Sequence, residues 1–178
     1  MGAALLVIDM LNPYEHDDAD VLADSVATIV EPLAGLIARA RETEEVELVY
    51  VNDQYEDFAA TREDLVRRAL DGRRPDLVEP LIPPADGAFL QKVRHSAFYG
   101  TALDHLLRRR EIDTVLLTGQ VTEQCILYSA LDAHIRHMDL TIPRDGVAHI
   151  HADLADAALR MTERNMGARV CAAEEIDL

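Results

Sequence analysis

Short apolar runs alternate with longer amphipathic stretches along this sequence, and the alternation limits the folds that the chain can adopt. The apolar runs lie at 3–8, 47–51, 88–93, 114–118, 139–142 and 168–172. Apolar residues recur at helical spacing in the stretches 20–42, 61–70, 101–110, 122–137 and 152–166. The pattern therefore predicts six strands that alternate with helices.

The predicted strands are almost uniformly apolar, which is typical of a sheet that is covered on both faces. Alternating strands and helices with right-handed crossovers form a doubly wound, Rossmann-like sheet. We therefore expect a single α/β domain over residues 1–178, with a six-stranded, mostly parallel sheet and helices on both faces. Pro32 lies inside the first helical stretch and predicts a kink or a break there.

The charge of the chain argues against two classes of partner. Asp and Glu together number 33, against 17 Lys and Arg, and the formal net charge is −16. Nucleic acids and anionic membrane surfaces are bound by clustered basic residues, so we expect neither as a partner. We find no secretory signal and no apolar run near the roughly 20 residues that span a bilayer. Two cysteines make no disulfide framework, and we predict a cytoplasmic protein.

Polar side chains at the ends of the predicted strands indicate where a site would lie. Doubly wound sheets bind ligands beyond the carboxyl ends of their strands, near the point where the strand order reverses. Asp9, Asn52 with Asp53, and Lys92 stand at three of these ends. Cys125 falls in the opening turn of a predicted helix, directly after another strand. The sequence therefore predicts a thiol, acids and an ammonium group on one rim of the sheet.

Each of these residues also has a purely structural interpretation. Cys125 could be an inert buried thiol, which is what we expect of Cys171. Asp9 could cap a neighbouring amide, and Lys92 could be an exposed lysine on an edge strand. However, a helix N-terminus favours a thiolate and can hold an oxyanion. A thiol in that position, together with an acid and a cation, indicates nucleophilic catalysis.

Three segments resemble the signature blocks of the isochorismatase-like cysteine hydrolases, a family that includes nicotinamidases and carbamoylsarcosine amidases. The segments are LLVIDM at 5–10, KVRHSAFYGT at 92–101 and GQVTEQC at 119–125. They occur in the family's order and at its spacing, and the resemblance covers essentially the whole chain.

The resemblance implies a catalytic triad of Asp9, Lys92 and Cys125. Asp9 would take the proton of the Cys125 thiol as the sulfur attacks a carbonyl carbon, and Lys92 would position Asp9. Backbone N–H groups of Val121 and Cys125 would hold the oxyanion, and the Gln120–Val121 peptide bond would be cis. An amine would leave, and water would hydrolyse the thioester. The implied reaction is hydrolysis of a small amide, ureido or related carbonyl compound, without a cofactor.

Three departures from the family pattern narrow this prediction. Leu11 and Asn12 replace a Gln that many members carry, and Gln120 stands at a position that is usually apolar. Nicotinamidases have an Asp-x-His metal site with a further His after the second strand, where this chain reads NDQYEDF at 52–58. We therefore expect that the chain binds no metal and resembles a metal-free branch of the family. Nicotinamide becomes a less favoured substrate.

The second block also predicts part of the substrate pocket. His95, Phe98 and Tyr99 follow Lys92 closely, and with Asn52 they are expected to line the pocket for a small-molecule substrate. Relatives often form dimers or tetramers, so the resemblance also implies a homo-oligomer.

Two other functions remain open. A vinyl-ether hydrolase acting on isochorismate would depend more on Asp9 and Lys92 than on the thiol. A catalytically silent member would use the fold to bind a metabolite or a partner. A receiver-like signalling domain also has Asp and Lys at strand ends, but it needs a cluster of acids where Met10 and Leu11 follow Asp9.

Overall fold

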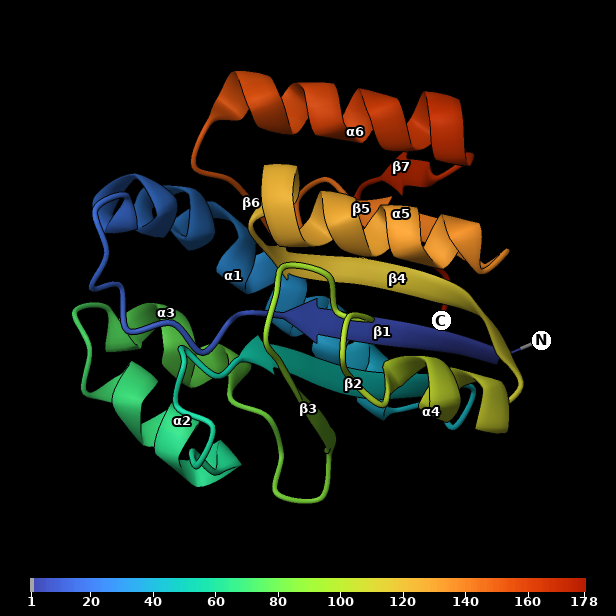
Figure 1. Cartoon of the computed structure of the whole chain (residues 1–178). Helices are drawn as coiled ribbons and strands as arrows, with labels where there is room; N and C mark the ends of the chain where they lie inside the picture. Colours follow the sequence, from blue (N-terminus) through green and yellow to red (C-terminus); the bar gives the residue numbers. More distant parts are fainter. Residues whose placement is uncertain (1) are drawn as a thin grey trace.

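A computed structural model describes residues 2–178, which form a parallel sheet between two layers of helices (Figure 1). The strands are β1 (Gly2–Ile8), β2 (Val46–Asp53), β3 (Ala88–Lys92), β4 (Ile112–Gln120), β5 (Asp139–Pro143), β6 (Val147–Ala148) and β7 (Arg169–Cys171). The helices are α1 (Ala19–Arg41), α2 (Arg62–Leu70), α3 (Pro75–Val78), α4 (Leu103–Arg109), α5 (Leu127–Ile135) and α6 (Ala152–Met166). Short 3₁₀ turns cover Glu79–Leu81 and Ala173–Glu175, and a π-helical turn covers Thr122–Ile126.

The strands pair in parallel in the order β3-β2-β1-β4-β5-β7, and β6 pairs with the end of β4. The chain runs outward from β1 through β2 and β3, and then returns to the other side of β1 with β4. The strand order therefore reverses between β1 and β4, where doubly wound sheets bind ligands. The predicted architecture is confirmed, except that the sheet has seven strands instead of six. The sequence did not predict β6 because this strand has only two residues and leaves no apolar pattern.

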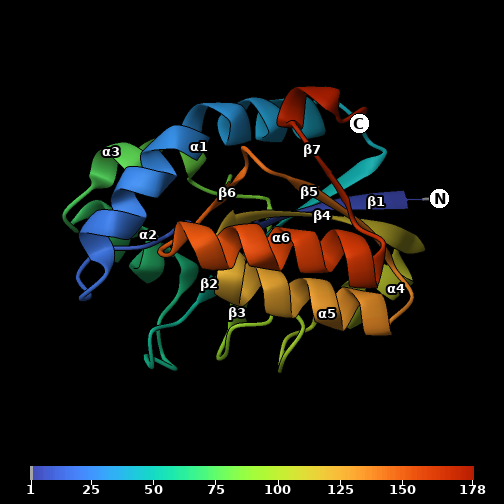
Figure 2. The ribbon, with the colours of Figure 1, turned by 90° about the horizontal axis from the view of Figure 1, so that it is seen from above.

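Alternate residues of β1 contribute to the two cores of the domain. Leu5 and Val7 belong to one apolar cluster with residues of α1, α2 and α3. Leu6 and Ile8 belong to a second cluster with residues of α4 and α5. Successive side chains of a strand point to opposite faces, so β1 is buried from both sides. Figure 2 shows α1 on one side of the sheet and α5 with α6 on the other.

Helix α1 continues through Pro32, so the break considered from the sequence is wrong. Val26 and Ile29 before the proline and Leu33 after it are all buried on the sheet side. This burial of both halves compensates for the hydrogen bond that the proline cannot donate. Among the described helices, α1 is also the one long and apolar enough to cross a membrane, with a mean hydropathy of 1.6. Its packing against the sheet makes it a core helix of this domain.

Candidate active site

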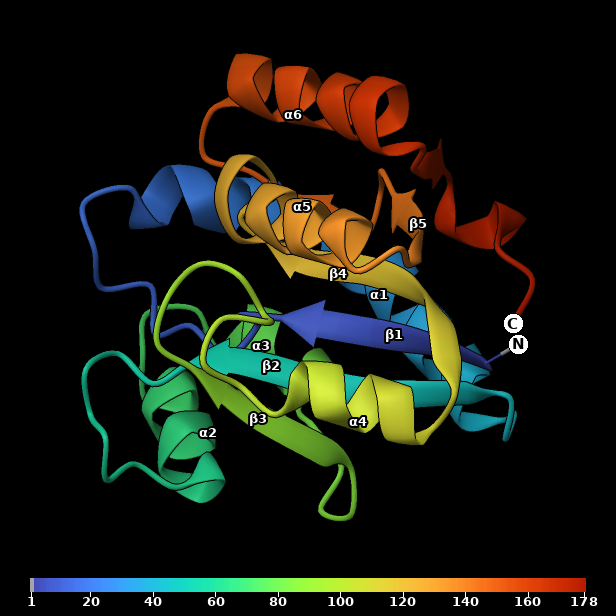
Figure 3. The ribbon, with the colours of Figure 1, turned by 45° about the vertical axis from the view of Figure 1, so that its right-hand side comes forward.

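The residues that end the central strands meet at one edge of the sheet. Asp9 directly follows β1, Lys92 is the last residue of β3, and Cys125 lies in the π-helical turn after β4. Figure 3 shows the arrowheads of β1 and β4 pointing to this same edge. A cavity of about 960 Å³ opens there, and all three side chains line it.

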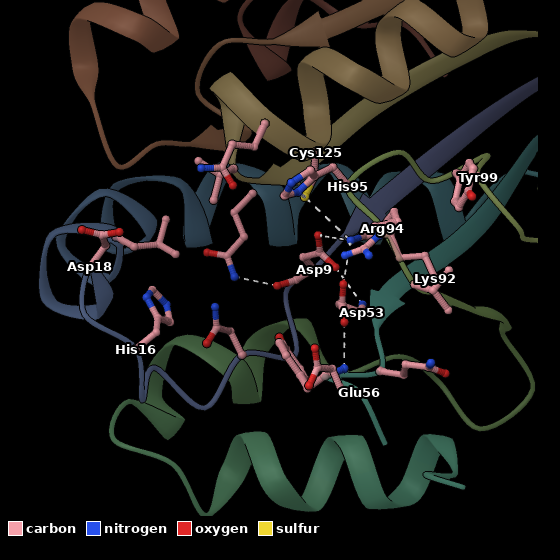
Figure 4. Close-up of a pocket in the computed structure, with 18 of the residues that line it drawn as sticks. Asp9, His16, Asp18, Asp53, Glu56, Lys92, Arg94, His95, Tyr99 and Cys125 are labelled. Atoms are coloured by element: carbon pink, nitrogen blue, oxygen red, sulfur yellow. Dashed lines mark hydrogen bonds and ion pairs between the residues drawn. The ribbon is translucent and has the colours of Figure 1, made fainter. Parts of the chain in front are cut away.

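Lys92 joins two carboxylates and the thiol (Figure 4). Its Nζ lies 2.9 Å from Asp9 Oδ2, 3.5 Å from Asp53 Oδ2 and 3.7 Å from Cys125 Sγ. Lys92 is only 1 % exposed, so these partners rather than bulk water compensate its charge. The structure therefore brings together the three residues of the predicted triad. The structure also shows Asp53 as a second carboxylate beside Lys92. The sequence placed Asp53 on the rim but did not reveal this contact.

Both carboxylate oxygens of Asp9 have fixed partners. Oδ2 pairs with Lys92, and Oδ1 accepts a hydrogen bond of 2.8 Å from the N–H of Asp53. The side-chain amide of Gln120 donates a hydrogen bond of 2.6 Å to the main-chain oxygen of Asp9. Asp9 has a φ of 58°, in the left-handed region that Asp tolerates better than most residues. These contacts orient the carboxylate toward the ammonium group and the thiol.

Gly119 allows the ends of β1 and β4 to approach each other closely. It pairs with Ile8 in the parallel ladder and has a φ of 105°. A Cβ atom at this position would lie 2.0 Å from the carbonyl oxygen of Ile8, a backbone atom with no room to move. A glycine is therefore needed to keep Asp9, which follows β1, close to the turn that carries Cys125.

The turn that carries Cys125 is tied to its surroundings. The Gln120–Val121 peptide bond is cis, the geometry that the resemblance implied. The carboxylate of Glu123 accepts hydrogen bonds of 3.0 and 2.7 Å from two backbone N–H groups in the segment before α6. N–H groups at the start of a helical segment lack acceptors within the helix, so this turn is suited to hold an oxyanion beside the thiol.

Burial dominates the electrostatics of the site. Burial, followed by the charge of Asp9, raises the pKa of the Cys125 thiol well above its usual range, although Lys92 opposes this. Burial also raises the pKa of the Asp9 carboxyl, again against Lys92. For Lys92, burial acts to lower the pKa, but the charges of Asp9, Cys125 and Asp53 outweigh it and hold the pKa above its ordinary value. Burial and the charge of Asp9 thus both favour the protonated thiol, and Lys92 favours the thiolate. The expectation that the helix N-terminus favours a thiolate stays a prediction, and burial acts against it.

Two of the four residues predicted to line the pocket, His95 and Tyr99, border the cavity. His95 also reaches the thiol, with its Nδ1 3.8 Å from Cys125 Sγ. Sequence reasoning did not assign several further lining residues to the pocket, among them His16, Glu56, Phe58, Arg94 and Gln124. Most of them lie in loops whose paths leave no periodic signal in the sequence.

The other two pocket predictions, Asn52 and Phe98, need correction because both side chains point into the protein. Asn52 is 2 % exposed, and its side chain exchanges hydrogen bonds with the N–H and the carbonyl of Leu11 at 2.9 and 3.3 Å. Phe98 packs in the core cluster with α4 and α5, beneath the guanidinium group of Arg136. Successive side chains of β2 point to opposite sides, and Asp53 rather than Asn52 faces the cavity.

The segment that corresponds to the nicotinamidase metal site is organised differently here. Asp53 pairs with Lys92, and the hydroxyl of Tyr55 donates a hydrogen bond of 2.8 Å to the carbonyl of Leu11. Within residues 2–178, no group of three or more His, Cys, Asp or Glu side chains is arranged to hold a metal ion. The polar groups of this segment therefore serve the Lys92 network and the loop after β1.

Known sequences resemble this chain along nearly its whole length. The family model for the isochorismatase domain matches residues 3–175. An uncharacterized isochorismatase family protein of Bacillus subtilis is 33 % identical over 173 residues, which cover 97 % of this chain and 95 % of that protein. Maleamate amidohydrolase of Pseudomonas putida is 32 % identical over 164 residues, which cover 88 % of this chain and 76 % of that enzyme.

Solved structures agree with this similarity. An isochorismatase-like hydrolase from Alkaliphilus metalliredigens has a TM-score of 0.80 at 26 % identity, covering 98 % of this chain and 96 % of that one. N-carbamoylsarcosine amidase from Thermoplasma acidophilum has a TM-score of 0.75 at 28 % identity, covering 100 % of both chains. With the family model matched from residue 3 to residue 175, the chain belongs to the isochorismatase family.

Proposed function

We propose that the chain is a cysteine-dependent amidohydrolase that cleaves a small amide, ureido or related carbonyl compound through a thioester on Cys125. One observation carries the proposal. The buried Lys92 ammonium lies 2.9 Å from the carboxylate of Asp9 and 3.7 Å from the sulfur of Cys125. A nucleophile beside a base that a third group orients is the arrangement expected for covalent catalysis.

The raised pKa values favour proton transfer during attack over a preformed thiolate. As the sulfur bonds to the carbonyl carbon, the thiol proton passes to the carboxylate of Asp9. Burial raises the pKa of this carboxyl and so makes Asp9 a stronger base than an exposed carboxylate. Lys92 holds Asp9 in place and compensates its charge. When the C–N bond breaks, the proton on Asp9 passes to the leaving nitrogen, which departs as ammonia or an amine.

The tetrahedral intermediate carries its negative charge on the former carbonyl oxygen. We assign the backbone N–H groups of Val121 and Cys125 as its donors, because they lie at the start of the helical segment that continues into α5. The partial positive charge of that helix end stabilises the same oxyanion.

The names of the relatives support an amide substrate. Maleamate and N-carbamoylsarcosine, after which two of them are named, both contain a C–N bond at a carbonyl carbon. Polar and charged side chains line the cavity of this chain, among them Asp53, Arg94 and Gln124. Such a lining suits a small polar amide better than a long apolar one.

Ammonia release from a panel of small amides and ureido compounds, including maleamate and N-carbamoylsarcosine, tests this function. We expect turnover of at least one compound, its loss in Cys125→Ala and its retention in the matched variant Cys171→Ala. Ammonia release that survives in Cys125→Ala would contradict the thioester mechanism. Pyruvate release from isochorismate that survives in the same variant would instead support vinyl-ether hydrolysis.

A further inference from the structure

The imidazole of His95 contacts the reacting sulfur, although the acylation step described above does not use it. Its Nδ1 lies 3.8 Å from Cys125 Sγ, about as close as the Nζ of Lys92 at 3.7 Å. Figure 4 shows the His95 ring next to the sulfur. His95 is exposed to solvent, whereas Asp9 and Lys92 are buried. The sulfur therefore has a second acid–base group on the side of the site that water can reach.

The position of His95 is built into the fold. The N–H of Ala97, two residues further on, donates a hydrogen bond of 2.9 Å to the hydroxyl of Ser129 in α5. The same hydroxyl donates a hydrogen bond of 2.6 Å to the carbonyl of Cys125. The His95 ring also packs against the ring of Tyr128, with 5.5 Å between the centroids. One serine thus couples the loop of His95 to the residue that carries the thiol.

Hydrolysis of a thioester needs a base that an incoming water molecule can reach. Asp9 is 8 % exposed, and its two carboxylate oxygens are occupied by Lys92 at 2.9 Å and by the Asp53 N–H at 2.8 Å. His95 lines the same cavity as Asp9 but is exposed to solvent, and it lies within one water molecule of any carbonyl carbon bonded to Cys125 Sγ. The location of His95 therefore suits hydrolysis of the thioester better than the location of Asp9 does.

We propose that His95 is the general base of deacylation. This rests on the thioester mechanism proposed above. Neutral His95 takes a proton from water as the water oxygen bonds to the thioester carbonyl carbon. When the C–S bond breaks, the sulfur leaves as a thiolate and receives that proton from His95. Asp9, which has already given its proton to the leaving amine, stays ionised through this step. The products are a carboxylic acid and the free thiol of Cys125.

The chromogenic ester p-nitrophenyl acetate separates the two steps, because its leaving group departs as an anion and needs no proton. The initial burst of p-nitrophenolate reports acylation of Cys125, and the slower steady release reports deacylation. The variant His95→Phe keeps a ring against Tyr128 but has no nitrogen. We expect its burst rate to stay within about two-fold and its steady rate to fall by about 100-fold, the usual contribution of a general base. Acetylated Cys125 should accumulate in intact mass spectra, and hydroxylamine, a stronger nucleophile than water, should speed its release.

His134, an exposed histidine of α5 outside the cavity lining, supplies the matched control, and His134→Phe should change neither phase. The variant His95→Gln should behave as His95→Phe does. A merely structural role would lower the burst and the steady rate together, and that result, or two unchanged phases, would overturn the proposal. A wild-type protein without a burst, or a burst that persists in Cys125→Ala, would count against Cys125 as the nucleophile. The proposed function would then fail together with the role of His95.

Discussion

Cys125 and Cys171 expose the same small fraction of their surface, but their surroundings differ. Each is 6 % exposed, and each lies at the carboxyl end of the sheet, Cys171 as the last residue of β7. Cys125 follows the central strand β4 and contacts Lys92 and His95. Burial raises the pKa of Cys171 as well, but the largest charge that opposes this shift is that of Arg169, which is exposed. At equal exposure, the charged partners therefore distinguish the surroundings of Cys125 from those of Cys171.

The positions of the two strands account for this difference. Strand β4 has β1 on one side and β5 and β6 on the other, so polar residues from several strand ends surround the turn that follows it. Strand β7 lies at the edge of the sheet and pairs only with β5. A thiol after an edge strand has fewer neighbouring strand ends from which an acid or a cation could reach it.

Replacing Asp9, the base of the proposed mechanism, should have the largest effect. In Asp9→Asn the side chain keeps its size but cannot take the thiol proton, so kcat/KM should fall by a factor on the order of 10⁴. Asp145 supplies the matched control near Cys171, because its carboxylate accepts a hydrogen bond from the N–H of Ala173. Steady-state kinetics of Asp145→Asn should show wild-type activity. Equal losses of kcat/KM in Asp9→Asn and Asp145→Asn would mean that the surroundings of Cys125 and Cys171 do not differ in the way described.

Removing the cation should affect stability as well as activity. In Lys92→Met the buried carboxylate of Asp9 loses its partner, so the free energy of unfolding should fall by roughly 3–5 kcal/mol. The double variant Asp9→Asn/Lys92→Met should recover part of this loss, because no uncompensated charge stays buried. Urea denaturation measures both values. A double variant that is less stable than Lys92→Met would show that the single loss does not come from the unpaired carboxylate.

The smallest of these effects should be a change in the rate at which Cys125 is labelled when Asp9 is replaced, with no matching change at Cys171. Iodoacetamide reacts with the thiolate, and burial with the charge of Asp9 raises the pKa of Cys125, so its labelling near pH 8 should be slow. In Asp9→Asn that charge is absent and the pKa of the thiol falls, so labelling at the same pH should accelerate by about ten-fold. Cys171 serves as the internal control in mass spectra of the same samples. Fast labelling of Cys125 in the wild type that slows in Asp9→Asn would show instead that the acid holds a thiolate.

The strands and the edge that carries the site could be predicted from the sequence, because most apolar runs stop at a polar residue. Asp9 and Lys92 were placed in this way, and strand alternation indicated that they share one edge. The unbroken helix through Pro32 could not be predicted, because burial on both sides of the proline depends on the sheet that α1 covers. Strand β6 was missed because it exists only through its pairing with β4.

The directions of side chains and the charge of the thiol depend on packing that the sequence does not reveal. Asn52 and Asp53 are neighbours at the end of β2, and nothing in their order says which one faces the cavity. For Cys125, a helix N-terminus acts to lower the pKa of the thiol and burial acts to raise it, and the sequence does not reveal how deeply the thiol is buried. The formation of a dimer or a tetramer stays a prediction.

Gly119 has a consequence for how this enzyme can diverge. Loop residues around the cavity, such as Glu56 and Arg94, can be exchanged one at a time, and the accepted substrate can change with them. The spacing of the two central strands allows no such gradual change, because even a methyl group at 119 would meet the Ile8 carbonyl at 2.0 Å. Laboratory evolution toward new substrates should therefore accumulate replacements in the loops and leave position 119 invariant, although Gly119 takes no part in the chemistry.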